Sequence, residues 1–76
     1  MDSGKEQTIG DLMRQYNNKL AGYKRMEEWA ATATKEELER YRRHTRQVVA
    51  ECSEALNALT RHIRVSEDEV KNGFDI

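Results

Sequence analysis

Apolar side chains recur at intervals of three and four along two long segments of this 76-residue chain, which contains no proline. This spacing places them on one face of an α-helix, because a helical turn takes 3.6 residues. Thr8 is suited to cap the first helix, and Asp11 lies in the first turn, where the helix dipole favours an acid. We therefore expect a helix over about 9–31. Its apolar face consists of Ile9, Leu12, Met13, Tyr16, Leu20, Tyr23, Met26 and Ala30.

The second long segment has a sharper start signal. Thr34 and Glu37 have the spacing of a capping box, in which each side chain bonds the backbone N–H of the other residue. We expect a helix over about 35–64. Its apolar face is formed by Leu38, Tyr41, Thr45, Val48, Cys52, Ala55 and Leu59, and is widened by Val49, Leu56 and Ile63.

The C-terminal region repeats the capping-box pattern at Ser66 and Glu69, which predicts a short third helix over about 67–72. Gly73 then provides a stop signal. The tail, 73–76, contains apolar residues, so we expect it to dock on another surface. Residues 1–7 are polar and have no period, so we interpret them as a flexible lead before one helical domain, 8–76.

The connection between the two long helices contains neither glycine nor proline. One continuous helix over 9–64, roughly 84 Å long, is therefore the alternative to a hairpin. Three features favour a break: Glu27 lies on the apolar face, 31–34 has no core-sized side chain, and a capping box has no purpose inside a helix. The predicted fold class is all-α, an antiparallel helical hairpin with a short C-terminal helix.

Composition agrees with a folded helical protein, because 13 basic residues nearly balance 14 acidic ones. Disordered chains usually combine low hydrophobicity with a large uncompensated charge. Cys52 is the only cysteine, so the chain has no internal disulfide and an intracellular setting is the default. No window approaches the run of about 18 apolar residues typical of a membrane span. We expect a cytoplasmic protein with no membrane partner.

Self-association would cover apolar surface that a lone hairpin leaves exposed. Two facing helices bury only part of each apolar face, and a chain this short is near the lower limit for an independent core. We expect two hairpins to form a twofold-symmetric four-helix bundle, a homodimer. The candidate dimer core consists of Leu38, Tyr41, Val48, Val49, Cys52, Leu56, Leu59 and Ile63.

A basic run supplies the most conspicuous charge cluster. It contains Arg40, Arg42, Arg43 and Arg46, and the spacing of a continued helix adds Arg64 to one flank. Arginine presents a fork that matches phosphate, so one interpretation is a patch that binds nucleic acid or a nucleotide. The other interpretation is a solvated face on which Glu36 and Glu39 pair with the arginines four residues later. The acidic pI of about 6.1 favours the second interpretation.

Trp29 is the only tryptophan, and a regular helix would place it roughly 140° from the centre of its apolar face. One interpretation is that it folds over the hairpin turn, against Leu38 for example. The other is that it anchors a partner, because exposed tryptophans are enriched at binding hot spots. Phe74 and Ile76 are the other candidate anchors.

Catalytic and cofactor motifs do not stand out. The sequence has no glycine-rich phosphate loop and no nucleophile elbow. His44 and His62 would lie about 27 Å apart on one helix, too far to share a metal ion. We predict no catalysis, cofactor or metal. The leading function is a non-enzymatic protein–protein interaction module, a small dimeric adaptor, inhibitor or regulator, and the alternative is binding of nucleic acid or a nucleotide through the arginine patch.

Overall fold

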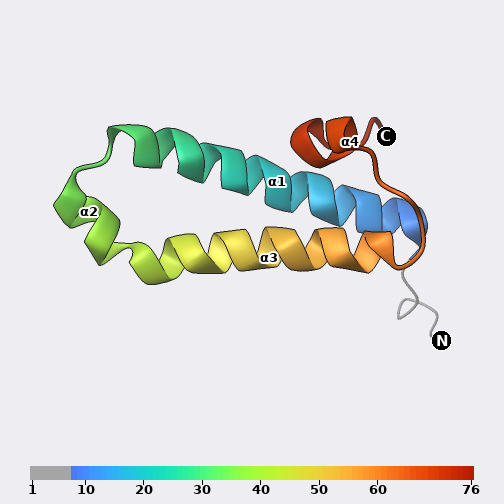
Figure 1. The fold of residues 1–76 in the computed structure, drawn as a ribbon, viewed down its shortest axis with the longest axis horizontal. Coiled ribbons are helices and arrows are strands. Elements are labelled where there is room, and N and C mark those ends of the chain that lie inside the picture. Colours follow the sequence, from blue (N-terminus) through green and yellow to red (C-terminus); the bar gives the residue numbers. More distant parts are fainter. Residues whose placement is uncertain (1–7) are drawn as a thin grey trace.

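The computed structural model describes residues 8–76 and consists of four helices in that part of the chain (Figure 1). The bounds are α1, Ile9–Thr32, α2, Lys35–Arg40, α3, Arg42–Thr60, and α4, Glu67–Asn72. The flexible lead expected at 1–7 lies outside the described residues.

Three helices begin at the capping boxes that the side chains form. Thr8, Thr34 and Ser66 each accept a hydrogen bond from the backbone N–H three residues later, at 3.1 Å in every case. The carboxylate at that later position accepts a hydrogen bond from the backbone N–H of the cap residue. These local bonds satisfy donors that a helix start otherwise leaves unpaired. The expected starts of α1, α2 and α4 are confirmed.

The two long helices, α1 and α3, pack side by side and run in opposite directions (Figure 1). The turn between them contains α2, and Ala33 and Thr34 have extended backbone that ends α1. Lys19 of α1 forms an ion pair with Glu51 of α3 at 3.1 Å across the hairpin. The hairpin prediction is therefore confirmed, and one continuous helix is excluded.

The helix expected over 35–64 is wrong in two respects. Tyr41 leaves helical geometry, with φ −102° and ψ 18°, and so divides the segment into α2 and α3. Its ring packs edge-to-face on Trp29, with centroids 5.7 Å apart. The helix also ends at Thr60, because the N–H groups of His62 and Ile63 both turn back to the carbonyl of Leu59. The chain can then return along α1 as α4.

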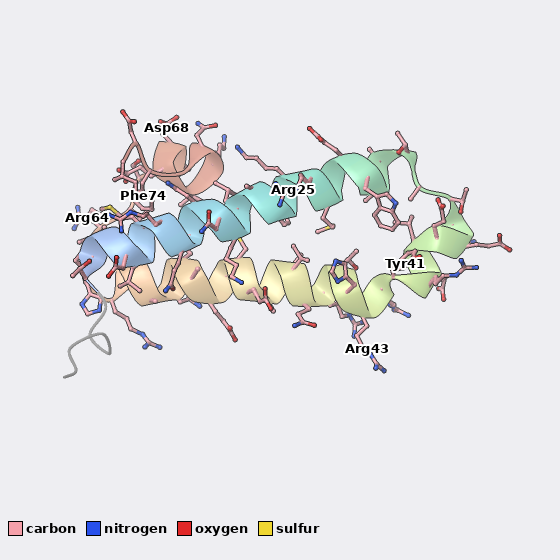
Figure 2. All side chains as sticks on the ribbon, turned by 180° about the vertical axis from the view of Figure 1, so that it is seen from behind. Arg25, Tyr41, Arg43, Arg64, Asp68 and Phe74 are labelled. Carbon is pink, nitrogen blue, oxygen red and sulfur yellow. The ribbon has the colours of Figure 1, made fainter. Side chains whose placement is uncertain are left out.

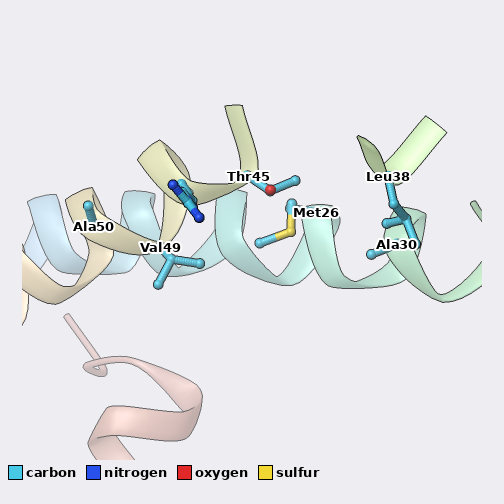
Figure 3. A pocket seen from close by; sticks show the side chains of 7 residues that line it. Met26, Ala30, Leu38, Thr45, Val49 and Ala50 are labelled. Atoms are coloured by element: carbon cyan, nitrogen blue, oxygen red, sulfur yellow. The ribbon is translucent and has the colours of Figure 1, made fainter. Parts of the chain in front are cut away.

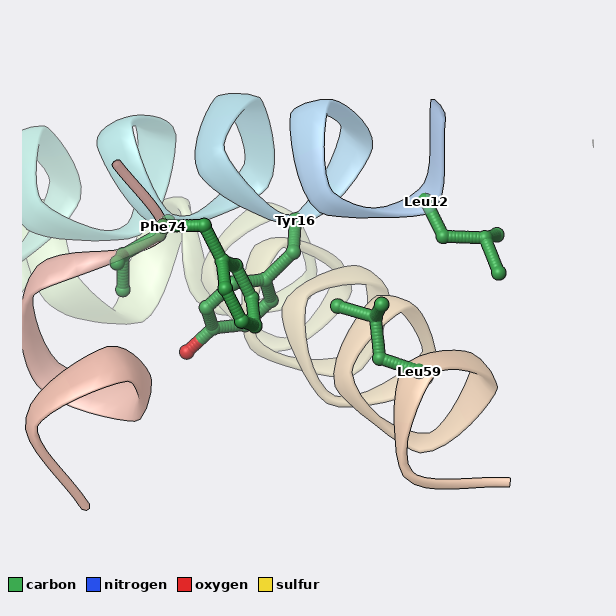
Figure 4. Close-up of a cluster of buried hydrophobic side chains, with 5 residues drawn as sticks. Leu12, Tyr16, Leu59 and Phe74 are labelled. Carbon is green, nitrogen blue, oxygen red and sulfur yellow. The ribbon is translucent and has the colours of Figure 1, made fainter. Parts of the chain in front are cut away.

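The buried core of the described residues lies at the end of the hairpin that carries α4, which we call the tail end (Figure 4). It consists of Leu12, Tyr16, Leu20, Leu59 and Phe74. The Tyr16 and Phe74 rings meet edge-on at 5.9 Å. The expectation that the tail docks is confirmed, since Phe74 contributes directly to this core. The opposite end, near α2, is called the turn end and has no fully buried side chain among these residues.

Candidate docking groove and arginine hollow

The tail end shows how the hairpin accepts a third helix. The Tyr16 hydroxyl of α1 donates to the Val70 carbonyl of α4 at 2.5 Å. Asn17 accepts from the Phe74 N–H at 2.7 Å and donates to the Phe74 carbonyl at 2.9 Å. These bonds join residues more than 50 positions apart and fix α4 and the tail against α1. Leu20, Leu56 and Val70 line the hollow that remains between the three helices.

The turn end has an open apolar groove where no third helix is present, with a volume of about 620 Å³ (Figure 3). We call this surface the turn-end groove. Leu38 and Val49 within it are 40% and 43% exposed, high values for branched aliphatic side chains. The groove is lined by Met26, Ala30, Leu38, Thr45, Arg46, Val49 and Ala50.

The turn-end groove continues the surface on which α4 packs. Val49 lines the turn-end groove and also the hollow beside Val70 of α4. The same side of the hairpin is therefore covered by a helix at the tail end and uncovered at the turn end. Small side chains at Ala30 and Ala50 leave space that a partner side chain can fill.

The basic run forms a second surface feature at the junction of α2 and α3. Arg40, Arg42, Arg43 and Arg46 line one hollow of about 590 Å³ together with Glu39. We call it the arginine hollow. At about 100° per residue these four positions span roughly 160° of a regular helix, so they share one side of the chain. The break at Tyr41 changes the direction of the chain between Arg40 and Arg42, and the four side chains surround one space.

Ion pairing does not neutralise these arginines within residues 8–76. The expected pairs Glu36–Arg40 and Glu39–Arg43 are not formed, because the ion pairs of the described residues join Arg14 to Asp11 and Lys19 to Glu51. The first turn of α3 contains no acid and its start has no side-chain cap. Positive charge there is unfavourable, because the start of a helix carries partial positive charge.

Arg64 does not belong to this cluster. The helical spacing that placed it beside the other arginines fails, because α3 ends at Thr60. Arg64 lies in the connection to α4, at the opposite end of the hairpin from Arg43 (Figure 2).

The three candidate partner anchors occupy different environments. Trp29 is half-buried at the turn end, where its ring packs edge-to-face on Tyr41. Phe74 is only 8% exposed, so its ring is used within the chain and is not free to anchor a partner. Ile76 is 63% exposed.

The residues expected in a dimer core also divide into two groups. Leu59 is fully buried inside the chain, and Cys52, Leu56 and Ile63 pack around it, so they serve the core of one hairpin. Leu38, Tyr41 and Val49 are exposed, and Val48 is half-buried on the other side of the hairpin, near Trp29. The sequence analysis did not name Ala50 as a groove residue. Its small side chain beside the apolar Val49 could have indicated a hollow on this face.

Three titratable groups on α1 and α3 have raised pKa values. Burial raises the pKa of the Cys52 thiol, which disfavours the nucleophilic thiolate. Burial also raises the pKa of Tyr16, and the neighbouring Glu27 carboxylate raises the pKa of Tyr23. Among residues 8–76, no three His, Cys, Asp or Glu side chains gather as metal ligands would.

A helix able to cross a membrane is not found in the described part of the chain. No protein-family model, curated protein or solved structure matches this chain.

Proposed function

We propose that the protein is a non-enzymatic interaction module that binds helices through the turn-end groove. The observation that carries the proposal is the uncovered half of a surface whose other half already holds a helix. The contacts of α4 and the tail with α1 illustrate how this side of the hairpin can hold a helix. Localisation in the cytoplasm stays a prediction from composition.

The partner that we propose first is a second copy of the chain. Two hairpins that meet through the turn-end groove bring four long helices together in a twofold-symmetric four-helix bundle. Leu38 and Val49 of each copy would then be covered, and burying such side chains contributes about 1.5–3 kcal/mol each when burial is complete. Leu59 takes no part in this interface, since its own chain encloses it.

The mass of Val49→Asp in solution tests the proposal. An aspartate in the middle of the groove would lose its hydration in a dimer, so the variant should be monomeric at concentrations where the unaltered chain is a dimer. Asn57→Asp is the matched control, because Asn57 is exposed on α3 and does not line the groove. Light scattering after size-exclusion chromatography reads both masses. An unaltered chain that is monomeric throughout would reject self-association, and equal masses for the two variants would reject this surface.

A further inference from the structure

We infer that the arginine hollow is a binding site for a multiply charged phosphate ligand. This inference does not rest on the groove, because Arg40, Arg42 and Arg43 line the hollow without lining the groove. Only Arg46 borders both surfaces.

The guanidinium groups of the hollow lie around one space. Four arginines within seven residues of the sequence share one hollow, on both sides of the break at Tyr41. Guanidinium groups carry several N–H donors in a planar fork that matches phosphate oxygens. A hollow of about 590 Å³ bordered by such groups can hold more than one phosphate group.

The hollow also concentrates positive charge. Four like charges lie together, and within residues 8–76 Glu39 is the one acid on the border of the hollow and forms no ion pair with these arginines. The first turn of α3 also contains Arg42 and Arg43, where the helix dipole disfavours cations. By contrast α1, α2 and α4 have acids in the first turn. An arrangement that is unfavourable for the free chain becomes favourable when an anion is bound.

The number of charges favours phosphate over the carboxylates of an acidic protein segment. A single carboxylate neutralises one guanidinium, whereas a chain of linked phosphates places several negative charges within the width of the hollow. Free polyphosphates, nucleotides and nucleic-acid backbones share this chemistry. The source is therefore a question for the binding experiment.

The experiment measures binding of tripolyphosphate, of a short single-stranded DNA and of a poly-glutamate peptide of similar charge. Calorimetry is used for the first probe, and fluorescence anisotropy for the labelled polymers. We expect tripolyphosphate, the DNA or both to bind, and poly-glutamate to bind more weakly. Binding of both phosphate probes with similar affinity identifies free phosphates as the source, and binding of the DNA alone identifies nucleic acid.

The test variant is Arg42→Gln with Arg43→Gln, and the matched control is Arg25→Gln with Arg61→Gln, which removes the same charge from exposed positions outside the hollow. We expect the test variant to weaken binding at least about tenfold and to reduce the slope of log affinity against log salt by about two. The control should bind like the unaltered chain.

Thermal unfolding separates a binding role from a structural one. Removing cations from the first turn of α3 should leave Tm unchanged or raise it, whereas arginines that hold the fold together would lower Tm when replaced. The inference is overturned if neither phosphate probe binds, if poly-glutamate binds more tightly than both, or if the control loses as much affinity as the test variant. None of these outcomes affects self-association through the groove.

Discussion

Replacing Leu59 by alanine should remove a large part of the stability of the chain. Leu59 is 0% exposed and belongs to a buried cluster of five side chains. Leucine-to-alanine replacements in such positions cost about 2.7–5.0 kcal/mol, because transfer energy is lost and a cavity remains. A chain of this length has a total free energy of unfolding of about 4–11 kcal/mol. We expect a loss of about 3 kcal/mol, since the ends of a small hairpin can partly close the cavity.

Urea unfolding followed by far-UV circular dichroism measures this loss. With a slope near 1 kcal/mol per molar urea for a small protein, the midpoint should fall by about 3 M. Leu38→Ala is the control, because it deletes the same atoms from a side chain that is 40% exposed at the turn end. At the lowest usable protein concentration, where a dimer is least populated, it should cost less than about 1 kcal/mol. Equal losses for the two variants would refute the placement of the core at the tail end.

Four further outcomes follow from individual residues of α1 and of the C-terminal tail. Gly73→Ala should lower stability by about 2 kcal/mol in thermal unfolding, because φ is +87° and the added Cβ would lie 2.6 Å from Oδ1 of Asn17. Gly22→Ala, inside α1 with open space around it, should instead raise stability by about 1 kcal/mol. Tyr16→Phe should cost about 1 kcal/mol and speed amide exchange in α4, because the hydroxyl bond to that helix is lost. Hydrogen bonds from the backbone N–H and the hydroxyl of Thr8 lower the pKa of Asp11 from its usual 3.8. The stabilisation by the Asp11 carboxylate is therefore present above pH 3.8 and is lost as the pH falls through the lower folded-state pKa. Asp11→Asn should flatten this part of a plot of unfolding free energy against pH.

The sequence was sufficient where structure depends on neighbours along the chain. Each capping box joins residues three positions apart, so the starts after Thr8, Thr34 and Ser66 were visible in the sequence. The periodic apolar faces likewise indicated two long helices. These signals are local, and local backbone donors are satisfied by local side chains.

Features that depend on distant contacts were missed. The Trp29–Tyr41 contact is made across the turn, and nothing near Tyr41 in the sequence indicated a break. The end of α3 at Thr60 was hidden because Ile63 continues the apolar spacing while packing on the core from outside the helix. Bonds from Tyr16 and Asn17 reach the C-terminal region and set where the tail lies.

The arginine hollow combines a feature that the sequence indicated with one that it did not. The basic run was visible in the sequence, yet the spacing of a continued helix wrongly added Arg64 to it. The four arginines that share one space lie on both sides of the break at Tyr41, which the sequence did not indicate. The turn-end groove was anticipated as surplus apolar surface, but its position required knowledge of how much of that surface α4 covers.

Sedimentation equilibrium of the unaltered chain over a wide concentration range tests self-association through the turn-end groove most directly. We expect the average mass to rise with concentration from 8.9 kDa to twice that value, with no larger species. A mass that stays at 8.9 kDa at every concentration would contradict it, and would show that the turn-end groove is not covered by a second copy.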